Sequence, residues 1–185
     1  MRTRKLGYTD LRLTTMGLGT WAIGGGGWQW GWGPQDDAES IAALQRGLDL
    51  GINWIDTAAA YGLGRAEEVV GRAIADRRGE VIIATKCGLV WDEGSTEVYG
   101  RLTAESVRAE CEASLRRLNV DVIDLYQIHW PIDEEHLEEA WSTISDLIQE
   151  GKVRYAGVSN FSVAQLKRIQ PIHPLASLQP PYSML

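Results

Sequence analysis

Three apolar segments of this chain each run directly into a side chain that can donate or accept a proton. These side chains are Asp56 after residues 52–55, Lys86 after residues 81–85 and His129 after residues 122–128. Tyr61 stands five residues beyond Asp56. Short apolar segments between longer helical patterns are typical of parallel strands, whose carboxyl ends all lie on one rim of the sheet. We therefore expect a carboxylate, an amine, an imidazole and a phenol to meet at one site.

Together these groups could protonate a carbonyl oxygen while a hydride arrives at the carbonyl carbon. Lys86 should be partly desolvated at its strand end, and the Asp56 carboxylate would keep its amine charged. A charged Lys86 beside Tyr61 should lower the pKa of the phenol from its usual value of about 10. Tyr61 would then donate a proton near neutral pH. His129 could hold and polarise an oxygen atom between itself and Tyr61.

Each of these residues also has a structural explanation when it is taken alone. Asp56 could cap the turn that follows it, and Lys86 could extend from a strand end to water. His129, before Trp130 and Pro131, could be a hydrogen-bonded histidine where a strand ends. Their occurrence at successive strand ends, together with Tyr61, favours an active site.

The surrounding sequence alternates between expected strands and expected helices. After a small hairpin over residues 5–13, we expect six strands at residues 14–19, 52–55, 81–85, 122–128, 153–158 and 175–178. Expected helix caps are Asp36, Thr103, Asp133 and Ser162. A polar loop is expected over residues 91–101.

Two α/β folds are compatible with this alternation, and a (β/α)8 TIM barrel fits better. A doubly wound sheet would place Gly-x-Gly-x-x-Gly after its first strand, and residues 17–22 lack the last glycine. A complete barrel takes about 250 residues, whereas this chain has 185. We therefore expect residues 1–185 to be one barrel domain with about six of its eight βα units, incomplete at its carboxyl end.

Composition excludes several other classes of protein. A net charge of −7 and a pI of about 5.0 argue against a nucleic-acid-binding surface. No apolar stretch approaches the roughly 18–20 residues of a membrane span, and no signal-peptide segment follows the basic amino terminus. Cys87 and Cys111 show no metal-binding spacing, and strand alternation turns Cys87 away from the Lys86 side. A cytoplasmic location is expected.

Residues 24–33 form a loop rich in glycine and tryptophan near the same rim. Its tryptophans, Trp28, Trp30 and Trp32, offer flat apolar surfaces on a flexible backbone. The loop could be a wall of the substrate site, or its tryptophans could pack on the scaffold with no contact to substrate. The sequence leaves both interpretations open.

At this point several motifs resemble those of one family, the aldo-keto reductases, over the whole chain and in the correct order. The motifs are residues 17–21 (GLGTW), 56–62 (DTAAAYG), 84–86 (ATK), 124–129 (DLYQIH), 151–153 (GKV) and 157–161 (GVSNF). Residues 128–131 (IHWP) and 179–182 (QPPY) look most like the bacterial general-stress and inositol-operon branch.

The resemblance implies a (β/α)8 barrel that reduces aldehydes and ketones with NADPH (NADP) and without a metal. Its catalytic residues would be Asp56, Tyr61, Lys86 and His129, with Tyr61 as proton donor. Cofactor-binding residues would be Thr20, Trp21, Asp56, Ser159, Asn160 and Gln179. The resemblance also places Trp21 near the substrate and lets His129 orient its carbonyl. Trp28 and Trp30 of the tryptophan loop, and Trp130, are further expected substrate contacts. In this family the adenosine 2′-phosphate is held after the seventh and eighth strands, which lie outside the six expected here.

The sequence is also compatible with two other functions. The same fold serves as a binding or regulatory protein in the potassium-channel β subunits, and a truncated or cofactor-deficient barrel could act in that way. A metal-dependent barrel hydrolase would need a His-x-His pair on the first strand, where this chain has Leu18, Gly19 and Thr20. If the chain were complete, its open sheet edges would favour self-association. The expected partner is otherwise a small carbonyl compound.

Overall fold

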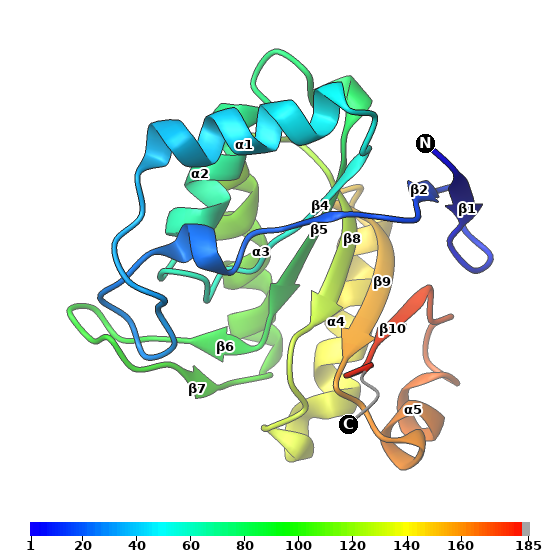
Figure 1. The fold of residues 1–185 in the computed structure, drawn as a ribbon. Helices are drawn as coiled ribbons and strands as arrows, with labels where there is room; N and C mark the ends of the chain where they lie inside the picture. The colour runs from blue at the N-terminus through cyan, green and yellow to red at the C-terminus, as the bar shows by residue number, and fades with distance from the viewer. Residues whose placement is uncertain (183–185) are drawn as a thin grey trace.

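A parallel sheet of six strands forms the centre of the structure, a computed structural model that describes residues 1–182 (Figure 1). The strands are β3 (Leu18–Gly19), β4 (Trp54–Asp56), β5 (Ile82–Cys87), β8 (Ile123–Ile128), β9 (Val153–Ser159) and β10 (Ser177–Gln179). They neighbour one another in the order in which they occur along the chain. A doubly wound sheet would instead reverse its winding at a switch point. The sheet is therefore a curled part of a (β/α)8 barrel, as the sequence predicted.

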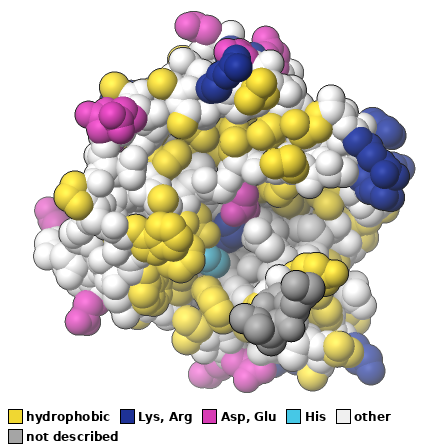
Figure 2. Space-filling model, viewed as in Figure 1, with side chains coloured by type: hydrophobic (Ala, Val, Ile, Leu, Met, Phe, Trp, Pro, Cys, Tyr) yellow, Lys and Arg dark blue, Asp and Glu magenta, His cyan; other side chains and the backbone are white. Residues whose placement is uncertain are grey.

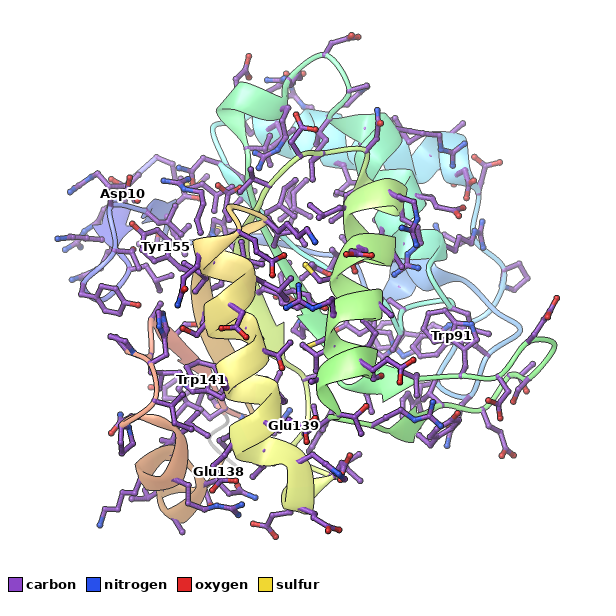
Figure 3. The ribbon with its side chains drawn as sticks, turned by 180° about the vertical axis from the view of Figure 1, so that it is seen from behind. Asp10, Trp91, Glu138, Glu139, Trp141 and Tyr155 are labelled. Carbon is purple, nitrogen blue, oxygen red and sulfur yellow. The ribbon has the colours of Figure 1, made fainter. Side chains whose placement is uncertain are left out.

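Helices join successive strands and cover one face of the sheet. They are α1 (Asp37–Asp49), α2 (Arg65–Ala73), α3 (Ala104–Leu118), α4 (Leu137–Gln149) and α5 (Val163–Ile169), with short 3₁₀ helices η1 (Ala22–Gly24), η2 (Arg78–Glu80) and η3 (Glu134–His136). Seen from behind, α3 and α4 lie in front of the strands (Figure 3). Three predicted caps are present, since Asp36, Thr103 and Ser162 each accept a hydrogen bond from the backbone three residues on.

Most of the apolar core lies between the helices and the sheet. Val107, Cys111 and Leu118 form an apolar stripe of α3 that is buried there, and Trp141 of α4 is fully buried in the same core. Cys87 belongs to this core as well, on the opposite face of β5 from Lys86, as strand alternation predicted. The helix-covered face therefore carries the packing and leaves the strand ends available for polar groups.

Two small antiparallel hairpins lie at opposite ends of the parallel strands, one near their amino ends and the other near their carboxyl ends. One pairs β1 (Thr3–Lys5) with β2 (Arg12–Thr14), and Thr14 contacts Asn53 just before β4. The other pairs β6 (Leu89–Val90) with β7 (Tyr99–Gly100), directly after β5. The second hairpin was missed, because its two-residue strands fall in and beside a polar segment that was predicted to be a loop.

Other predicted boundaries were also wrong. Residues 14–19 are not one strand, because the Thr14 hydroxyl donates to the Met16 carbonyl and turns the chain between β2 and β3. β5 continues to Cys87, so Lys86 lies inside the strand. β10 begins at Ser177, two residues later than expected.

Asp133 does not cap α4 as predicted. A 3₁₀ turn, η3, separates Asp133 from α4. The Asp133 carboxylate instead accepts the Leu102 backbone N–H at 2.8 Å and contacts the His136 ring at 2.7 Å. Asp133 therefore ties the start of α4 to the approach to α3.

No helix within residues 1–182 combines the length and the apolar character that a membrane crossing requires.

The close approach of α2 to α3 yields a stability prediction at Gly71. A Cβ there would lie 2.7 Å from the carbonyl oxygens of Arg117 and Leu118. Alanine normally stabilises a helix by about 1 kcal/mol relative to glycine, but overpacking costs about 1–3 kcal/mol. We expect Gly71→Ala to lower the denaturation midpoint in urea. The control is Gly79→Ala, where a Cβ meets nothing within 4 Å. Equal or greater stability of Gly71→Ala would contradict the observed helix contact.

Candidate active site

Lys86 is the most buried charged group of the candidate site, with 2% of its side chain exposed. Its ammonium donates to Asp56 Oδ2 at 2.8 Å and to the Thr57 carbonyl at 2.9 Å. It also lies 3.4 Å from the Tyr61 hydroxyl. β4 and β5 are neighbours, and Asp56 pairs with Ala84, two residues before Lys86. The sheet register therefore brings the ammonium within reach of the residues that follow β4.

Tyr61 lies in the turn after β4, with its backbone N–H bonded to the Ala58 carbonyl. Its ring stacks on Trp21 at 6.4 Å between centroids and packs against Trp28 at 6.3 Å. This burial raises the pKa of the phenol above its ordinary value, and the positive charge of Lys86 opposes the rise. The lowered pKa expected from the sequence is therefore wrong for this structure, because desolvation outweighs the neighbouring charge.

His129 stands directly after β8 and meets the Tyr61 ring edge-on, with 5.6 Å between centroids. Its backbone N–H donates to the Cys87 carbonyl at 2.9 Å, and its own carbonyl accepts from Asn160 Nδ2 at 3.0 Å. Burial, assisted by the charge of Lys86, lowers the pKa of His129 to about 3. The imidazole is therefore neutral at physiological pH and can donate one N–H bond.

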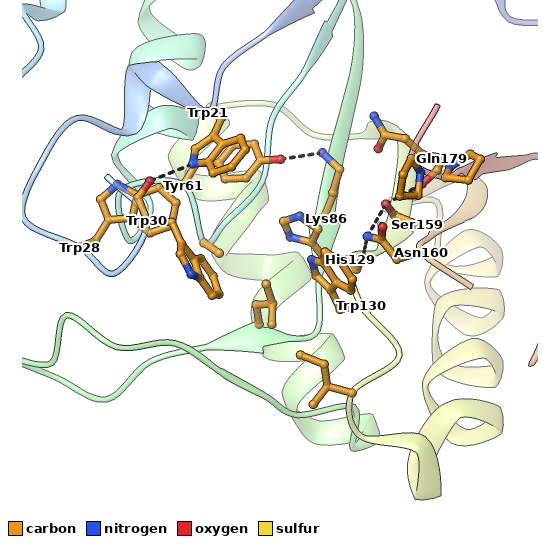
Figure 4. Close-up of a pocket in the computed structure, with 15 residues that line it drawn as sticks. Trp21, Trp28, Trp30, Tyr61, Lys86, His129, Trp130, Ser159, Asn160 and Gln179 are labelled. Atoms are coloured by element: carbon orange, nitrogen blue, oxygen red, sulfur yellow. Dashed lines mark hydrogen bonds between the residues drawn. The ribbon is translucent and has the colours of Figure 1, made fainter. Parts of the chain in front are cut away.

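The ends of β9 and β10 supply a second polar cluster. Ser159 Oγ donates to the Gln179 carbonyl at 2.9 Å, and Asn160 Nδ2 donates to Ser159 Oγ at 3.0 Å. Asn160 has a φ of 62°, a left-handed conformation that asparagine tolerates better than most residues. Its amide is thus held toward both Ser159 and His129 (Figure 4).

These groups line one cavity of about 570 Å³, a size suited to small organic ligands. Its polar lining is Tyr61, Lys86, His129, Ser159, Asn160 and Gln179. Its apolar lining includes Trp21, Trp28, Trp30, Leu89, Trp130 and Ile132. Figure 2 shows a hollow on this face, with charged side chains and a histidine between hydrophobic ones. The cavity is therefore mostly apolar, with its proton-handling groups close together.

The structure brings together nearly all the residues singled out from the sequence. Thr20 and Asp56 do not line the cavity. Thr20 is 1% exposed, and its hydroxyl donates to the Asp56 carbonyl at 3.1 Å, so it supports the end of β4. Leu89 and Ile132 were missed as cavity residues. No chemical signal marks an aliphatic side chain, and only recognition of the β6–β7 hairpin would have pointed to Leu89.

The cavity residues fit a nicotinamide cofactor on chemical grounds. A carboxamide needs an acceptor for its NH₂ group and a donor for its oxygen. Asn160 uses Nδ2 to bind His129 and Ser159, while its Oδ1 and the side-chain amide of Gln179 make no hydrogen bond within residues 1–182. Acceptors and a donor are thus available.

Within residues 1–182 the structure contains no group of three or more His, Cys, Asp or Glu side chains arranged to hold a metal ion.

Comparison with known proteins identifies the family of the chain. A family model described as the aldo/keto reductase family matches residues 15–185. Aldo-keto reductase YhdN of Bacillus subtilis is 41% identical over 100% of this chain and 54% of its own length. The NADH-specific methylglyoxal reductase of Escherichia coli is 37% identical over 100% of this chain and 60% of its own length.

A solved structure agrees with these relatives. The glycerol dehydrogenase AKR11B4 from Gluconobacter oxydans matches with a TM-score of 0.86 and 43% identity, over 97% of this chain and 55% of that one. The chain thus spans little more than half the length of the relatives it matches. The family model, the sequence identity to these relatives and the shared fold all lead to the same conclusion. The chain belongs to the aldo/keto reductase family.

Proposed function

We propose that the protein reduces aldehydes or ketones to alcohols with a nicotinamide cofactor, and that Tyr61 donates the proton. One observation carries the proposal. The Tyr61 hydroxyl, the Lys86 ammonium and the neutral His129 ring meet at the polar end of an otherwise apolar cavity. A carbonyl compound could enter with its oxygen toward Tyr61 and His129 and its hydrocarbon part along the tryptophans.

In this mechanism the carbonyl oxygen lies between two hydrogen-bond donors. Tyr61 gives up its proton to the oxygen, and His129 orients the carbonyl through one ring N–H. The nicotinamide, when bound, supplies a hydride to the carbonyl carbon. Because burial raises the pKa of Tyr61, the phenol is protonated at neutral pH and ready to act as the acid.

Lys86 and Asp56 support the loss of that proton. The ammonium lies 3.4 Å from the Tyr61 hydroxyl and stabilises the tyrosinate that forms. Asp56 holds Lys86 in place at 2.8 Å, and its carboxylate offsets the cost of burying the ammonium. The pair thus acts on the transition state more than on substrate binding.

For the cofactor we propose NADPH, held by Ser159, Asn160 and Gln179 beside Trp21. A solved aldo-keto reductase from Klebsiella pneumoniae, 32% identical with a TM-score of 0.69, is described in complex with NADPH. The NADH-specific relative from Escherichia coli makes NADH the alternative that an assay must compare. The proposal places this enzyme in the cytoplasm, with small carbonyl compounds as partners.

The first prediction from this proposal concerns the proton donor. We expect Tyr61→Phe to lower kcat for carbonyl reduction by about 10²–10⁴-fold, the usual contribution of general acid catalysis. Affinity for NADPH should stay unchanged, because the hydroxyl bonds Lys86 and is not part of the Ser159 and Asn160 cluster. Absorbance assays and a cofactor titration measure both. Tyr126→Phe is the matched control, since its hydroxyl is buried on the helix side of β8. Near-normal turnover of Tyr61→Phe would refute the assigned role.

The second prediction concerns the tryptophan loop. Trp30→Ala should raise KM for a large apolar aldehyde by about 10-fold and leave kcat for a small aldehyde unchanged, because the indole lines the cavity and packs on Trp28. Trp32→Ala, a control in the same loop but outside the cavity lining, should have a smaller effect. Identical relative activities across a graded aldehyde series would show that the loop is only structural.

The third prediction concerns the neutral state of His129. Its pKa of about 3 lies below the usual value of about 6.5, so the unfolded chain binds more protons than the folded chain between these values. His129 therefore makes stability fall as the pH drops below about 6.5, and His129→Gln should weaken that fall. Urea midpoints between about pH 4 and pH 8 measure the effect.

His136 provides a control of opposite sign. Its hydrogen bond to Asp133 raises the pKa of His136, so its contribution is full below about 6.5 and is lost as the pH rises through the raised value. His136→Gln should remove a stabilisation that is present at low pH. A His129→Gln variant with the same pH dependence as the parent would contradict a neutral, buried imidazole.

A further inference from the structure

Gln29 joins the tryptophan loop to a second loop that lies far away in the sequence. Its backbone N–H donates to the Thr96 carbonyl at 2.9 Å. Its side-chain Oε1 accepts the Val98 backbone N–H at 3.1 Å. Figure 1 shows the corresponding blue and green segments side by side. One residue thus makes two hydrogen bonds to the connection between β6 and β7.

That connection is braced by contacts of its own. The Tyr99 hydroxyl donates to Asp92 Oδ1 at 2.8 Å across its base. Ser95 Oγ accepts the Glu97 backbone N–H at 3.0 Å and donates to the Glu97 carbonyl at 3.4 Å. Since β6 continues from β5 after a single residue, the hairpin is an extension of the strand that carries Lys86. It offers Gln29 an ordered partner.

The tryptophan segment, residues 28–32, is flanked by two glycines with freedom to rotate. Gly27 and Gly33 have φ of 84° and 104°, and a Cβ at either position would meet nothing within 4 Å. From this segment, Trp28 Nε1 donates to the carbonyl of Gly25, which precedes the segment, at 3.0 Å. The backbone carbonyl of Trp30 accepts a hydrogen bond from Trp21 Nε1 at 3.1 Å. These two bonds tie residues 28–32 to Trp21 and Gly25, whereas Gln29 ties the same residues to the hairpin.

The position of Gln29 between two cavity residues gives the link its consequence. Trp28 and Trp30 line the cavity on either side of it in the sequence, and Leu89 of β6 lines the cavity from the hairpin. A link from Gln29 to Val98 therefore fixes the distance between two parts of one apolar wall. Without the side-chain bond to Val98, the segment keeps its backbone bond to Thr96 and its bonds to Gly25 and Trp21. A small rotation at Gly27 and Gly33 can then loosen the wall without detaching it.

We propose that Gln29 is a positioning residue that fastens residues 28–32 to the β6–β7 hairpin and so sets the cavity shape that large apolar carbonyl compounds require. This inference rests on the proposed carbonyl reduction for its kinetic consequence. The link itself is a property of the structure and can be measured without turnover. Gln29 acts through the tryptophans and the hairpin, and it does not line the cavity.

Two variants separate the hydrogen bond from side-chain size. Gln29→Met has a similar length but lacks a strong acceptor, whereas Gln29→Glu keeps an oxygen that can accept the Val98 N–H. Measurements in salt that screens the nearby Glu97 carboxylate keep charge repulsion from obscuring the comparison. The readouts are amide exchange at Val98, quenching of tryptophan fluorescence by 1-naphthaldehyde, and kinetics with 1-naphthaldehyde and propanal.

In Gln29→Met the Val98 amide should lose its protection, and the Kd and KM for 1-naphthaldehyde should rise by about 2- to 10-fold, as for one modest hydrogen bond. Values of kcat and KM for propanal should stay unchanged, and Gln29→Glu should restore parental behaviour. Unchanged Val98 exchange, or an equal loss for both aldehydes, would overturn the proposal.

Failure of the proposed function would look different from failure of this inference. If the parent protein reduces no carbonyl compound, carbonyl reduction is refuted, while amide exchange and the 1-naphthaldehyde titration still decide the role of Gln29. Loss of Val98 protection with an unchanged Kd for 1-naphthaldehyde would refute a role in shaping the cavity.

Discussion

A buried ammonium group must be surrounded by acceptors, and at Lys86 that requirement constrains the whole site. Only 2% of the Lys86 side chain is exposed, so water cannot compensate for its charge. Asp56 and the Thr57 carbonyl supply the acceptors, both from the end of β4. Removal of either the charge or its partner would leave an uncompensated group in a low-dielectric interior. The ends of β4 and β5 therefore have to meet in one register.

The rest of the structure provides that register. Large side chains such as Trp141 and Ile144 pack between the helices and the sheet and hold the strands in sequence order. On the other face the strand ends carry the polar groups, and Thr20 fixes β4 further through its bond to the Asp56 carbonyl. Apolar packing on one face thus makes a precise polar arrangement possible on the other.

The apolar cavity wall also sets the protonation states of the site. Burial against Trp21 and Trp28 raises the pKa of Tyr61 and keeps the phenol protonated. Burial beside the charge of Lys86 lowers the pKa of His129 to about 3 and keeps the imidazole neutral. One environment thus favours the neutral form of both groups, and in that form each of them has one hydrogen to donate to a carbonyl oxygen.

The sequence by itself determined the βα alternation, three helix caps and the convergence of Tyr61, Lys86 and His129. The spacing of apolar residues, the capping residues and the residues at strand ends are all local signals in the chain. The sequence did not determine the limits of the strands. Residues 14–19 are divided because β2 pairs with β1, whereas β3 pairs with β4. The tertiary structure alone decided the direction of the pKa shift of Tyr61, which depends on the balance of burial and charge. It also decided the contact of Gln29 with Val98, because a hydrogen bond between loops so far apart leaves no periodic signal in the chain.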